Sequence, residues 1–555
     1  MVDINFILQN KTASVPEGTT ILEAARQAGV VIESPCDGIG TCGKCKVLVK
    51  DAPGGSLRFD AAPHSLSSED MAKGYVLACQ AHVHGSLEVA YENTKSQNKT
   101  LKILSEGKSF AYQIKNNIQK TFDGQKTVVL AGGMQAGTEE GDTSASLYGC
   151  SIDIGTTTLV VALVDLITGE ETASKSALNP QSLQAQDVLT RIKLASSPEG
   201  LEKMYRDVTD EMNRMIGAVA KKAGVSRRHI YEVVYSGNTT MIHLACNVNP
   251  YSLGRYPYTP EITGGNGIPA DMLDISPYGL VYLPPIISAY VGPDITSGVL
   301  ASQLHKTKGT TLFIDIGTNG EMVIAKDGKL SATSTAAGPA FEGMNITYGM
   351  RAGMGALELF EILEDGEIKT STIGNVAANG ICGSGLLDIV GELVRVGAIA
   401  PNGKLVPPDK GNYPAQVKER MTQVEGKLCF EAAAGVYLTQ KDIRQVQLAK
   451  GAVRAGVEAL LKSLDITAED VGRVEIAGSF GYHLRAASLI NLGLLPREFV
   501  GKIDFVGNTS KTGGKAFLLN TDLREEMSQV VREIEGVELA NRPGFDKIFV
   551  AALNF

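Results

Sequence analysis

The 555-residue chain has no tryptophan and only eight cysteines. Eight cysteines are too few for a secreted fold stapled by disulfides at this length. Acidic residues outnumber basic ones, 61 to 52, which argues against nucleic acid as a partner. Residues 1–6 lack the basic start of a signal peptide, and no charge-free apolar run approaches the roughly 20 residues that span a bilayer. These absences predict a cytoplasmic protein with no membrane partner.

Glycine, by contrast, is abundant, with 61 residues. It makes up about 11% of the chain, against about 7% in an average protein, and no collagen-like period accounts for the excess. We therefore expect turns in which the backbone approaches a ligand closely. The length predicts two to four domains.

The first ninety or so residues carry strand patterns around one short helix. Thr20 and Glu23 have the spacing of a capping box, which predicts a helix start. Strand patterns with alternating or β-branched apolar residues occur over 2–8, 11–15, 46–49 and 87–91. A small sheet crossed by one helix predicts a β-grasp domain over residues 1–93.

Three of the eight cysteines lie within ten residues of one another. Cys36, Cys42 and Cys45 have the spacing C-x5-C-x2-C, and Cys79 is the next cysteine. This pattern resembles the plant-type ferredoxins, with the longer first spacing of adrenodoxin-type members. The glycines between the first three cysteines let backbone N–H groups turn toward sulfide, which stabilises a reduced cluster. The four thiolates are therefore the predicted ligands of one [2Fe–2S] cluster.

A structural zinc site is the alternative for four cysteines. Zinc sites more often use two short cysteine pairs than a triplet and a distant single residue, so the cluster is favoured. His82 and His84 follow Cys79, but four thiolates leave no position for histidine ligands. We predict that both histidines lie at the surface.

Residues 94–148 show weaker periodicity. They begin rich in Lys and Gln and end acidic and rich in Ser and Thr, with one strand pattern at 127–130. This composition predicts a solvated connector that lets the ferredoxin move relative to the second part of the chain.

Two segments of the second part repeat one pattern. Residues 149–158 read GCSIDIGTTT and residues 312–321 read LFIDIGTNGE, and an apolar run follows each. Both predict a strand, a tight glycine turn and a second strand, and their similarity indicates an internal duplication. Facing each other, the two turns would hold phosphates through backbone N–H groups. Their aspartates would hold Mg²⁺ or water.

These loops resemble those of the acetate kinase, sugar kinase, Hsp70 and actin superfamily, which bind ATP between two lobes. The resemblance implies an α+β multidomain chain, in which the β-grasp ferredoxin precedes a duplicated α/β actin-like ATPase over residues 149–555. Its lobes would cover about 149–305 and 306–555. A strand at 474–481 that ends in Gly-x-x-Gly is the expected contact for the nucleoside.

The same comparison implies a set of site residues. Asp153 and Asp315 are expected to position Mg²⁺ and water for ATP hydrolysis, and Glu321 and Asp294 to orient the attacking water. The residues expected to bind the nucleotide are Gly155, Thr156, Thr157, Thr158, Gly317, Thr318, Asn319, Gly320, Lys450, Gly478, Ser479 and Gly481. A simpler interpretation stays open for each, because acids at strand ends can be structural and Thr, Asn and Gly are ordinary turn residues.

A ferredoxin fused to such an ATPase is similar to the reductive activators of corrinoid proteins, including the activating enzymes of O-demethylase systems. The similarity covers nearly the whole chain. Segments that match in the same order are 177–181, 236–241, 338–343, 382–386, 439–443, 477–481 and 507–509. Two departures matter. The stretch before the ATPase is short for a separate middle domain, and no C-terminal cysteine cluster marks the archaeal type.

This resemblance implies ATP-dependent, one-electron reduction of cob(II)alamin to cob(I)alamin in a corrinoid protein that serves methyl transfer. It implies a [2Fe–2S] cluster, ATP and Mg²⁺ as cofactors, an unidentified upstream electron donor, and a homodimer formed through the ATPase half. One alternative is an ATP-driven electron donor to another low-potential enzyme, like the activators of 2-hydroxyacyl-CoA dehydratases. Others are a redox sensor that binds ATP without turnover and a small-molecule kinase.

Overall fold

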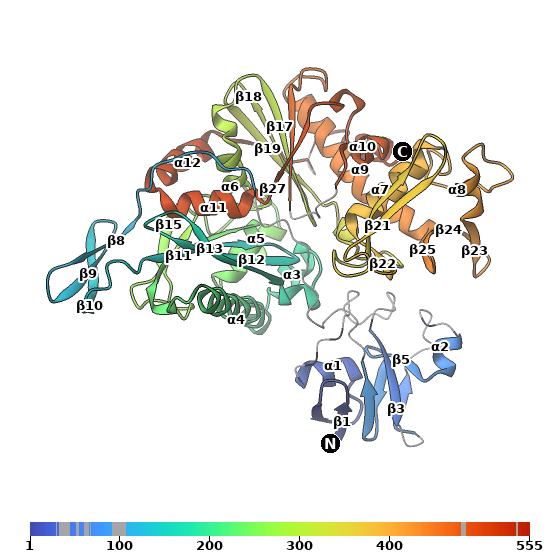
Figure 1. The fold of residues 1–555 in the computed structure, drawn as a ribbon, viewed down its shortest axis with the longest axis horizontal. Helices are drawn as coiled ribbons and strands as arrows, with labels where there is room; N and C mark the ends of the chain where they lie inside the picture. Colours follow the sequence, from blue (N-terminus) through green and yellow to red (C-terminus); the bar gives the residue numbers. More distant parts are fainter. Residues whose placement is uncertain are drawn as a thin grey trace. The chain divides into compact units, whose positions relative to one another are not determined.

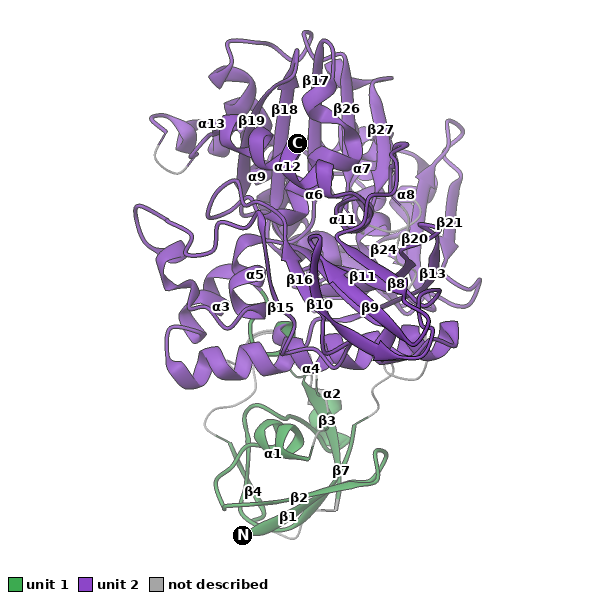
Figure 2. Cartoon of the chain, turned by 90° about the vertical axis from the view of Figure 1, so that its left-hand side faces the viewer, with its two compact units in different colours: residues 1–100, 182–186 green, residues 101–181, 187–555 purple. Residues whose placement is uncertain are grey.

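The chain forms two compact units. The computed structural model describes residues 1–28, 30, 32, 45–51, 55–59, 66, 68–91, 107–478, 484–539 and 542–555. One unit comprises residues 1–100 and 182–186, and the other comprises residues 101–181 and 187–555 (Figure 2). The predicted ferredoxin domain falls in the first unit. The predicted ATPase, apart from residues 182–186, falls in the second.

A five-stranded sheet, in the order β2-β1-β7-β3-β5, forms the first unit. Helix α1 begins at the predicted capping box, where the Thr20 hydroxyl accepts a hydrogen bond from the Glu23 amide at 3.1 Å. Buried Ile4, Phe6 and Ile21 belong to one core, and the β-grasp prediction is confirmed. The elements are β1 (Val2–Phe6), β2 (Lys11–Val15), α1 (Ile21–Gln27), β3 (Lys46–Asp51), β4 (Leu57–Phe59), α2 (Ser68–Ala72), β5 (Tyr75–Leu77), β6 (Ala81–Val83) and β7 (Leu87–Ala90).

The predicted connector over 94–148 is wrong for its second half, which is folded. Strands β8 (Ile118–Phe122), β9 (Lys126–Ala131) and β10 (Met134–Glu140) form an antiparallel sheet (Figure 1). The Lys120 side chain is inaccessible to solvent and lies 2.9 Å from the Glu139 carboxylate and 2.7 Å from the Tyr231 hydroxyl. The residue types that form this buried ion pair are also the ones that dominate solvated segments. The composition of residues 94–148 therefore suggested a connector.

Two large sheets of the second unit share one strand order. In the first sheet, β11 pairs antiparallel with β12 and parallel with β14. In the second, β17 pairs antiparallel with β18 and parallel with β26. The first sheet has the order β13-β12-β11-β14-β16-β15 and the second β28-β19-β18-β17-β26-β27. The predicted duplication is therefore visible in the topology.

The strand bounds of these sheets follow the sequence patterns closely. The first sheet contains β11 (Tyr148–Ile154), β12 (Thr158–Asp165), β13 (Glu171–Leu178), β14 (Ile230–Gly237), β15 (Asn266–Pro269) and β16 (Leu280–Leu283). The second contains β17 (Thr310–Ile316), β18 (Gly320–Lys326), β19 (Lys329–Thr335), β26 (Arg473–Ala477), β27 (Ile503–Gly507) and β28 (Glu535–Gly536). Both central strands, β11 and β17, are mostly buried, as is typical of strands that are covered on both faces.

Helices α6 and α11 pack against each other and against the first sheet. Although α11 lies in the predicted second lobe, its Lys511 carbonyl accepts a hydrogen bond from Ser151 on β11 at 2.9 Å. The lobe boundary at about 305 therefore does not coincide with the packing. The helices around the first sheet are α3 (Val188–Leu194), α4 (Pro198–Ala223), α5 (Thr239–Ala245), α6 (Pro293–Ser302), α11 (Thr509–Leu519) and α12 (Thr521–Glu533).

The remaining elements build out the second lobe around α7 and α9. Helix α9 starts at a second capping box, between Thr439 and Asp442, and packs on β18 and β19. No helix in the described part of the chain is both long and apolar enough to cross a membrane. These elements are β20 (Ala356–Ile362), β21 (Ile368–Thr372), β22 (Gly380–Ile381), α7 (Gly383–Arg395), α8 (Ala415–Glu419), β23 (Met421–Val424), β24 (Lys427–Ala433), β25 (Val436–Thr439), α9 (Gln440–Ser463), α10 (Ala486–Asn491) and α13 (Phe545–Ala552).

Candidate functional site

A cleft of about 170 Å³ lies between the two repeated turns of the second unit. All four predicted acids line it, as do both glycine turns. The predicted residues that the structure brings together here are Asp153, Gly155, Thr156, Thr157, Thr158, Asp294, Asp315, Gly317, Thr318, Asn319, Glu321 and Gly478. Residues from β11, β17 and α6 and the residue after β26 thus meet in one place, although 325 positions separate Asp153 from Gly478.

Each of the two turns is closed by one backbone hydrogen bond, but the second turn is one residue shorter. The Gly155 amide donates to the Thr158 carbonyl at 3.1 Å, and the Gly317 amide donates to the Asn319 carbonyl at 2.9 Å. Across the cleft, the Thr157 and Thr318 hydroxyl oxygens lie 3.3 Å apart. Turns that close on themselves in this way leave neighbouring N–H groups directed outward, the arrangement that binds phosphate oxygens.

Side chains outside the first glycine turn hold it by hydrogen bonds to its carbonyl groups. The Asn179 side chain donates to the Gly155 carbonyl at 2.8 Å. Arg191, whose side chain is fully buried, donates to the Thr156 carbonyl and, at 3.0 Å, to the Gln181 side chain. Burial lowers the pKa of Arg191 to about 9. The turn is therefore held in place by two side chains outside it.

The four acids of the cleft sit in a protein environment that disfavours their ionised forms. Burial and the charge of Asp315 raise the pKa of Asp294 to about 8, and burial and the charge of Asp153 raise that of Asp315 to about 7. The pKa of Glu321 is raised well above its ordinary value by burial and by Asp294. Clustered carboxylates of this kind become stable as anions when a cation joins them.

Asp153 differs from the others because it has hydrogen-bond donors. The Asn508 side chain donates to one of its carboxylate oxygens and the Ser510 hydroxyl to the other, both at 2.8 Å. Burial raises the pKa of Asp153, and these two hydrogen bonds oppose that rise.

A single cation lines the cleft among the residues that the structure describes. Arg351 is that residue, and Glu342 adds a fifth carboxylate. The Thr318 hydroxyl donates to Glu342 at 2.6 Å. The described lining therefore has four more acidic than basic side chains.

Gly478 closes the cleft at the end of β26. Its φ of +120° is one that other residues rarely adopt. A Cβ at this position would stand 2.7 Å from the Ile316 carbonyl and 3.1 Å from an Asp315 carboxylate oxygen. Ser479 and Gly481, the other predicted residues of this turn, lie outside the described residues.

Two predicted nucleotide contacts are not in the cleft lining. Gly320 lies in β18, beneath the turn. Lys450 on α9 is buried and donates to the Asn554 carbonyl, with its ammonium 5.2 Å from the centre of the Phe555 ring. Burial lowers the pKa of Lys450 to about 8. The sequence predicts Lys450 as a nucleotide contact but does not show which neighbours this buried lysine meets.

Several lining residues were not predicted as site residues. They are Asn238, Glu342, Arg351, Cys382, Ser384, Asn508 and Ser510. Asn238 follows β14 and Asn508 follows β27, each capping the helix that comes next. A polar residue between a buried strand and a helix was the available signal in both cases.

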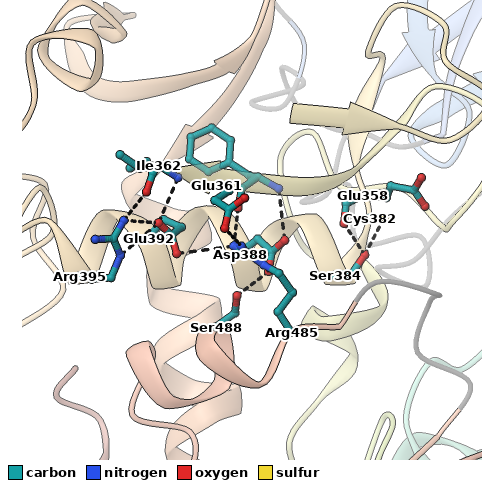
Figure 3. Close-up of polar contacts among 11 residues, drawn as sticks. Glu358, Glu361, Ile362, Cys382, Ser384, Asp388, Glu392, Arg395, Arg485 and Ser488 are labelled. Carbon is teal, nitrogen blue, oxygen red and sulfur yellow. Dashed lines mark hydrogen bonds and ion pairs between the residues drawn. The ribbon is translucent and has the colours of Figure 1, made fainter. Parts of the chain in front are cut away.

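Helix α7 begins at the cleft and is fixed by an acidic network along its length (Figure 3). Fully buried Asp388 accepts from Arg485 at 3.2 Å, from the Ser488 hydroxyl at 2.5 Å and from the Phe360 amide at 3.2 Å. Arg485 also lies 2.9 Å from Glu361. The network joins β20, α7 and the start of α10, and so holds the first turn of α7 in the cleft wall.

In the first unit, two of the four predicted cluster ligands are described. The Cys45 and Cys79 sulfurs lie 3.3 Å apart in the core, much longer than a disulfide bond. Pairing of Lys46 with Leu77 between β3 and β5 brings them together. Two buried thiols this close fit shared ligation of a [2Fe–2S] cluster. Cys36 and Cys42 lie outside the described residues.

Comparison with known proteins agrees with both halves of this geometry. Three family models match the chain: a 2Fe-2S iron-sulfur cluster binding domain over residues 6–84, the RACo middle region over 148–307, and the C-terminal ASKHA domain of RACo over 309–555. The corrinoid activation enzyme RamQ of Eubacterium limosum is 34% identical over 416 residues, which cover 73% of this chain and 70% of RamQ. The chain belongs to the RACo family.

Two further matches extend over most of the chain. A solved structure of a reductive activator for a corrinoid, iron–sulfur protein has a TM-score of 0.74 and 32% identity, covering 100% of this chain and 98% of its own. The [Co(II) methylated amine-specific corrinoid protein] reductase of Methanosarcina barkeri is 23% identical over 450 residues, 74% of this chain and 77% of the reductase. Membership confirms the predicted fold class, and it supports a [2Fe–2S] cluster and ATP binding. The RACo middle region, which the short connector had put in doubt, corresponds to the predicted first lobe.

Proposed function

We propose that this protein is an ATP-dependent reductive activator, which transfers one electron to the cobalt of a corrinoid protein and reduces cob(II)alamin to cob(I)alamin. The observation that carries the proposal is the presence, in one RACo-family chain, of a phosphate-type cleft between duplicated turns and a buried cysteine pair in a ferredoxin fold. The names of RamQ and the Methanosarcina reductase describe the same type of reaction.

Different residues of the cleft would have different roles in ATP hydrolysis. Asp153 and Asp315 would hold Mg²⁺ and its water, because they face each other across the cleft from β11 and β17. The backbone amides of the two turns would bind the phosphates. Asp294, whose pKa is raised to about 8, would accept a proton from the attacking water, because a carboxyl whose pKa lies near neutrality is suited to proton transfer. Glu321 would orient that water. Arg351 would offset charge on the phosphates.

The first unit supplies the electron. Cys36, Cys42, Cys45 and Cys79 would hold the [2Fe–2S] cluster, which when bound supplies a one-electron carrier near −400 mV. The cobalt couple is expected to lie lower. A gap of roughly 100–200 mV for one electron costs about 2–5 kcal/mol, a cost that binding or hydrolysis of ATP would offset.

The proposal is tested anaerobically with the full-length protein. Reduced protein, MgATP and a cob(II)alamin-bearing protein are mixed, and the visible spectrum is followed for cob(I)alamin. We expect ATP-dependent formation of cob(I)alamin. Its absence across a panel of corrinoid proteins, with and without ATP, would contradict the proposal.

Two variants separate the two halves of the activity. Cys45→Ala should abolish electron transfer but retain ATP binding, whereas Asp153→Asn should keep a reducible cluster and lose most of the ATP-dependent step. Cys429→Ala, which removes a cysteine from β24, is the matched control and should behave as wild type. Loss of ATP binding in Cys45→Ala would show that the two halves are not separable.

We also propose a homodimer formed through the ATPase half, and an upstream electron donor that reduces the ferredoxin unit. Sedimentation of the full chain and of a variant lacking residues 1–93 would test the first point. A dimer that persists without those residues supports it, and a monomer in both cases contradicts it.

A further inference from the structure

The segment that follows residue 106 lies along α11, the helix that supports the ATP cleft. We call residues 107–117 the strap, because they follow α11 from its first residue to its last within the second unit. The strap leads into β8 (Figure 1). Residues 92–106, which join it to the ferredoxin, lie outside the described residues.

The start of the strap contacts the two elements that carry cleft residues. Gly107 forms a bridge with Gly507, and the Lys108 amide donates to the Val506 carbonyl at 2.7 Å. The Lys108 carbonyl accepts from the Thr512 hydroxyl on α11 at 2.8 Å. The Lys108 ammonium lies 2.5 Å from Glu475, a residue of β26 that is only 1% exposed.

The end of the strap is held at the other end of α11. The Asn520 side chain donates to the Gln113 carbonyl at 2.8 Å. The Lys115 amide donates to the Leu519 carbonyl at 2.7 Å, and the Lys115 carbonyl accepts from the Thr521 amide at 3.0 Å. Backbone pairing at both ends means that the strap and α11 move together or separate together.

On its opposite side, the first turn of α11 holds Asp153. Asn508 caps the helix, with its side-chain oxygen accepting from the Lys511 amide at 2.9 Å, while its nitrogen donates to Asp153. Ser510 donates to the other carboxylate oxygen. Gly107 sits so close to Asn508 that a Cβ on Gly107 would overlap the Asn508 carbonyl oxygen. Asn508 therefore lies between the cleft acid and the strap and contacts both.

We propose that Asn508 and Ser510 are positioning residues for Asp153, and that α11 couples the occupancy of the ATP cleft to the docking of the strap. The proposal rests on the proposed function and adds the device that links its two halves. A cation and nucleotide bound at Asp153 would fix that carboxylate in place, and Asn508 and Ser510 would pass this restraint to the first turn of α11 because each donates a hydrogen bond to it. The nucleotide-bound cleft therefore holds α11 and the strap firmly, and the empty cleft holds them weakly.

Release of the strap changes the reach of the ferredoxin unit. Freeing residues 107–116 adds ten residues to the chain between the two units, about 33 Å when extended. ATP turnover would thereby alternate a short tether with a long one. This alternation would change how readily the ferredoxin meets an electron donor or a corrinoid acceptor.

Amide hydrogen exchange of the full-length protein tests the coupling directly. With a non-hydrolysable ATP analogue and Mg²⁺, we expect the Lys108 and Lys115 amides to exchange at least about threefold more slowly than without nucleotide. Ser510→Ala should lose most of this difference while it still binds the analogue. Equal exchange rates with and without bound nucleotide would overturn the proposal, as would an undiminished difference in Ser510→Ala.

A second test measures the effect of the strap on nucleotide binding, because coupling between two sites is reciprocal. Gly107→Ala, which forces the strap away from Asn508, should weaken nucleotide binding several-fold although residue 107 does not line the cleft. The milder Thr512→Val, which removes one hydrogen bond to the strap, should act in the same direction and serves if Gly107→Ala does not fold. The matched control is Gly137→Ala, whose Cβ would crowd Tyr278 beside β10 and not α11, and it should bind nucleotide as wild type does.

These readouts need no corrinoid protein. If exchange and affinity are coupled but no cob(I)alamin forms, the proposed function fails and the coupling stands. If cob(I)alamin forms and strap variants leave nucleotide affinity unchanged, the coupling fails alone.

Discussion

The two repeated segments that form the ATP cleft have the same strand topology, but the surroundings of their aspartates differ. Asp153 and Asp315 occupy equivalent ends of β11 and β17, and each precedes a glycine turn. Asp153 receives hydrogen bonds from Asn508 and Ser510, whereas the influences on the pKa of Asp315 are burial and the charge of Asp153. Duplication has therefore kept the strand topology and divided the chemistry, with one aspartate held in place by two donors and the other governed by burial and a neighbouring charge.

The largest expected effect comes from removing the held carboxylate. Asp153→Asn should lower ATP hydrolysis on the order of 10²–10³-fold, because it removes a charge that acts in an enclosed site. Asp315→Asn should lower hydrolysis less at high Mg²⁺ and raise the Mg²⁺ concentration needed for half-maximal rate. Steady-state hydrolysis over a Mg²⁺ series measures both. Equal losses with an equal Mg²⁺ requirement would show that the two aspartates are equivalent.

The second effect concerns the support of the first turn. Arg191→Met removes the fully buried guanidinium that holds the Thr156 carbonyl, and leaves Gln181 without its ion–dipole partner. The free energy of unfolding of the second unit should fall by about 3 kcal/mol, and nucleotide affinity should fall with it. Denaturant unfolding measures the first and titration with a fluorescent nucleotide the second. Arg206→Met, on the exposed face of α4, is the control and should change neither.

How far the sequence predicts this cleft depends on the kind of signal. The glycine turns and acids at 153 and 315 were predictable because the repeat itself is local and occurs twice. Asn508 and Ser510 were not, because no spacing rule connects them to an acid about 350 residues earlier. Lys450 shows the complementary case, since it was expected near the nucleotide but no local pattern shows which neighbour a buried lysine will meet.

The second half of the expected connector is folded because of a distant contact that local composition does not predict. Thr, Gly and acidic residues over 138–142 have the composition of a solvated chain. Glu139 instead pairs with Lys120 and accepts from the Tyr231 hydroxyl at 2.7 Å. A tertiary partner more than ninety residues away decides the structure, and composition carries no trace of it.

A third prediction uses pH to sharpen the comparison of the two aspartates. The pKa of Asp315 is about 7 in the folded protein and near 3.9 when unfolded. Between these values the folded state holds a proton that the unfolded state releases, so stability of the Mg²⁺-free protein falls as pH rises. The expected slope is about 1.4 kcal/mol per pH unit for each such proton.

Thermal unfolding between pH 5.5 and 7.5 measures this slope. Asp315→Asn should lower this slope by about 1.4 kcal/mol per pH unit, while Asp294 and Glu321, whose pKa values are also raised, keep the rest. Mg²⁺ with nucleotide should flatten the slope, because the carboxylates are then ionised in both the folded and the unfolded state. Glu140→Gln, at an exposed residue of β10, should leave the slope unchanged. An undiminished slope in Asp315→Asn would assign the proton to Asp294 or Glu321 instead.

The smallest expected effect separates the two turns themselves. The Thr157 and Thr318 hydroxyls lie 3.3 Å apart across the cleft, but only Thr318 also donates to Glu342, at 2.6 Å. Thr157→Val should weaken nucleotide binding by about 1 kcal/mol, roughly a fivefold change. Thr318→Val should weaken nucleotide binding by less. In the wild type a phosphate must displace the hydrogen bond between Thr318 and Glu342 before it binds, and this substitution removes that hydrogen bond. Titration with nucleotide distinguishes the two, and a larger loss in Thr318→Val would mean that Glu342 holds Thr318 in the binding geometry and does not compete for it.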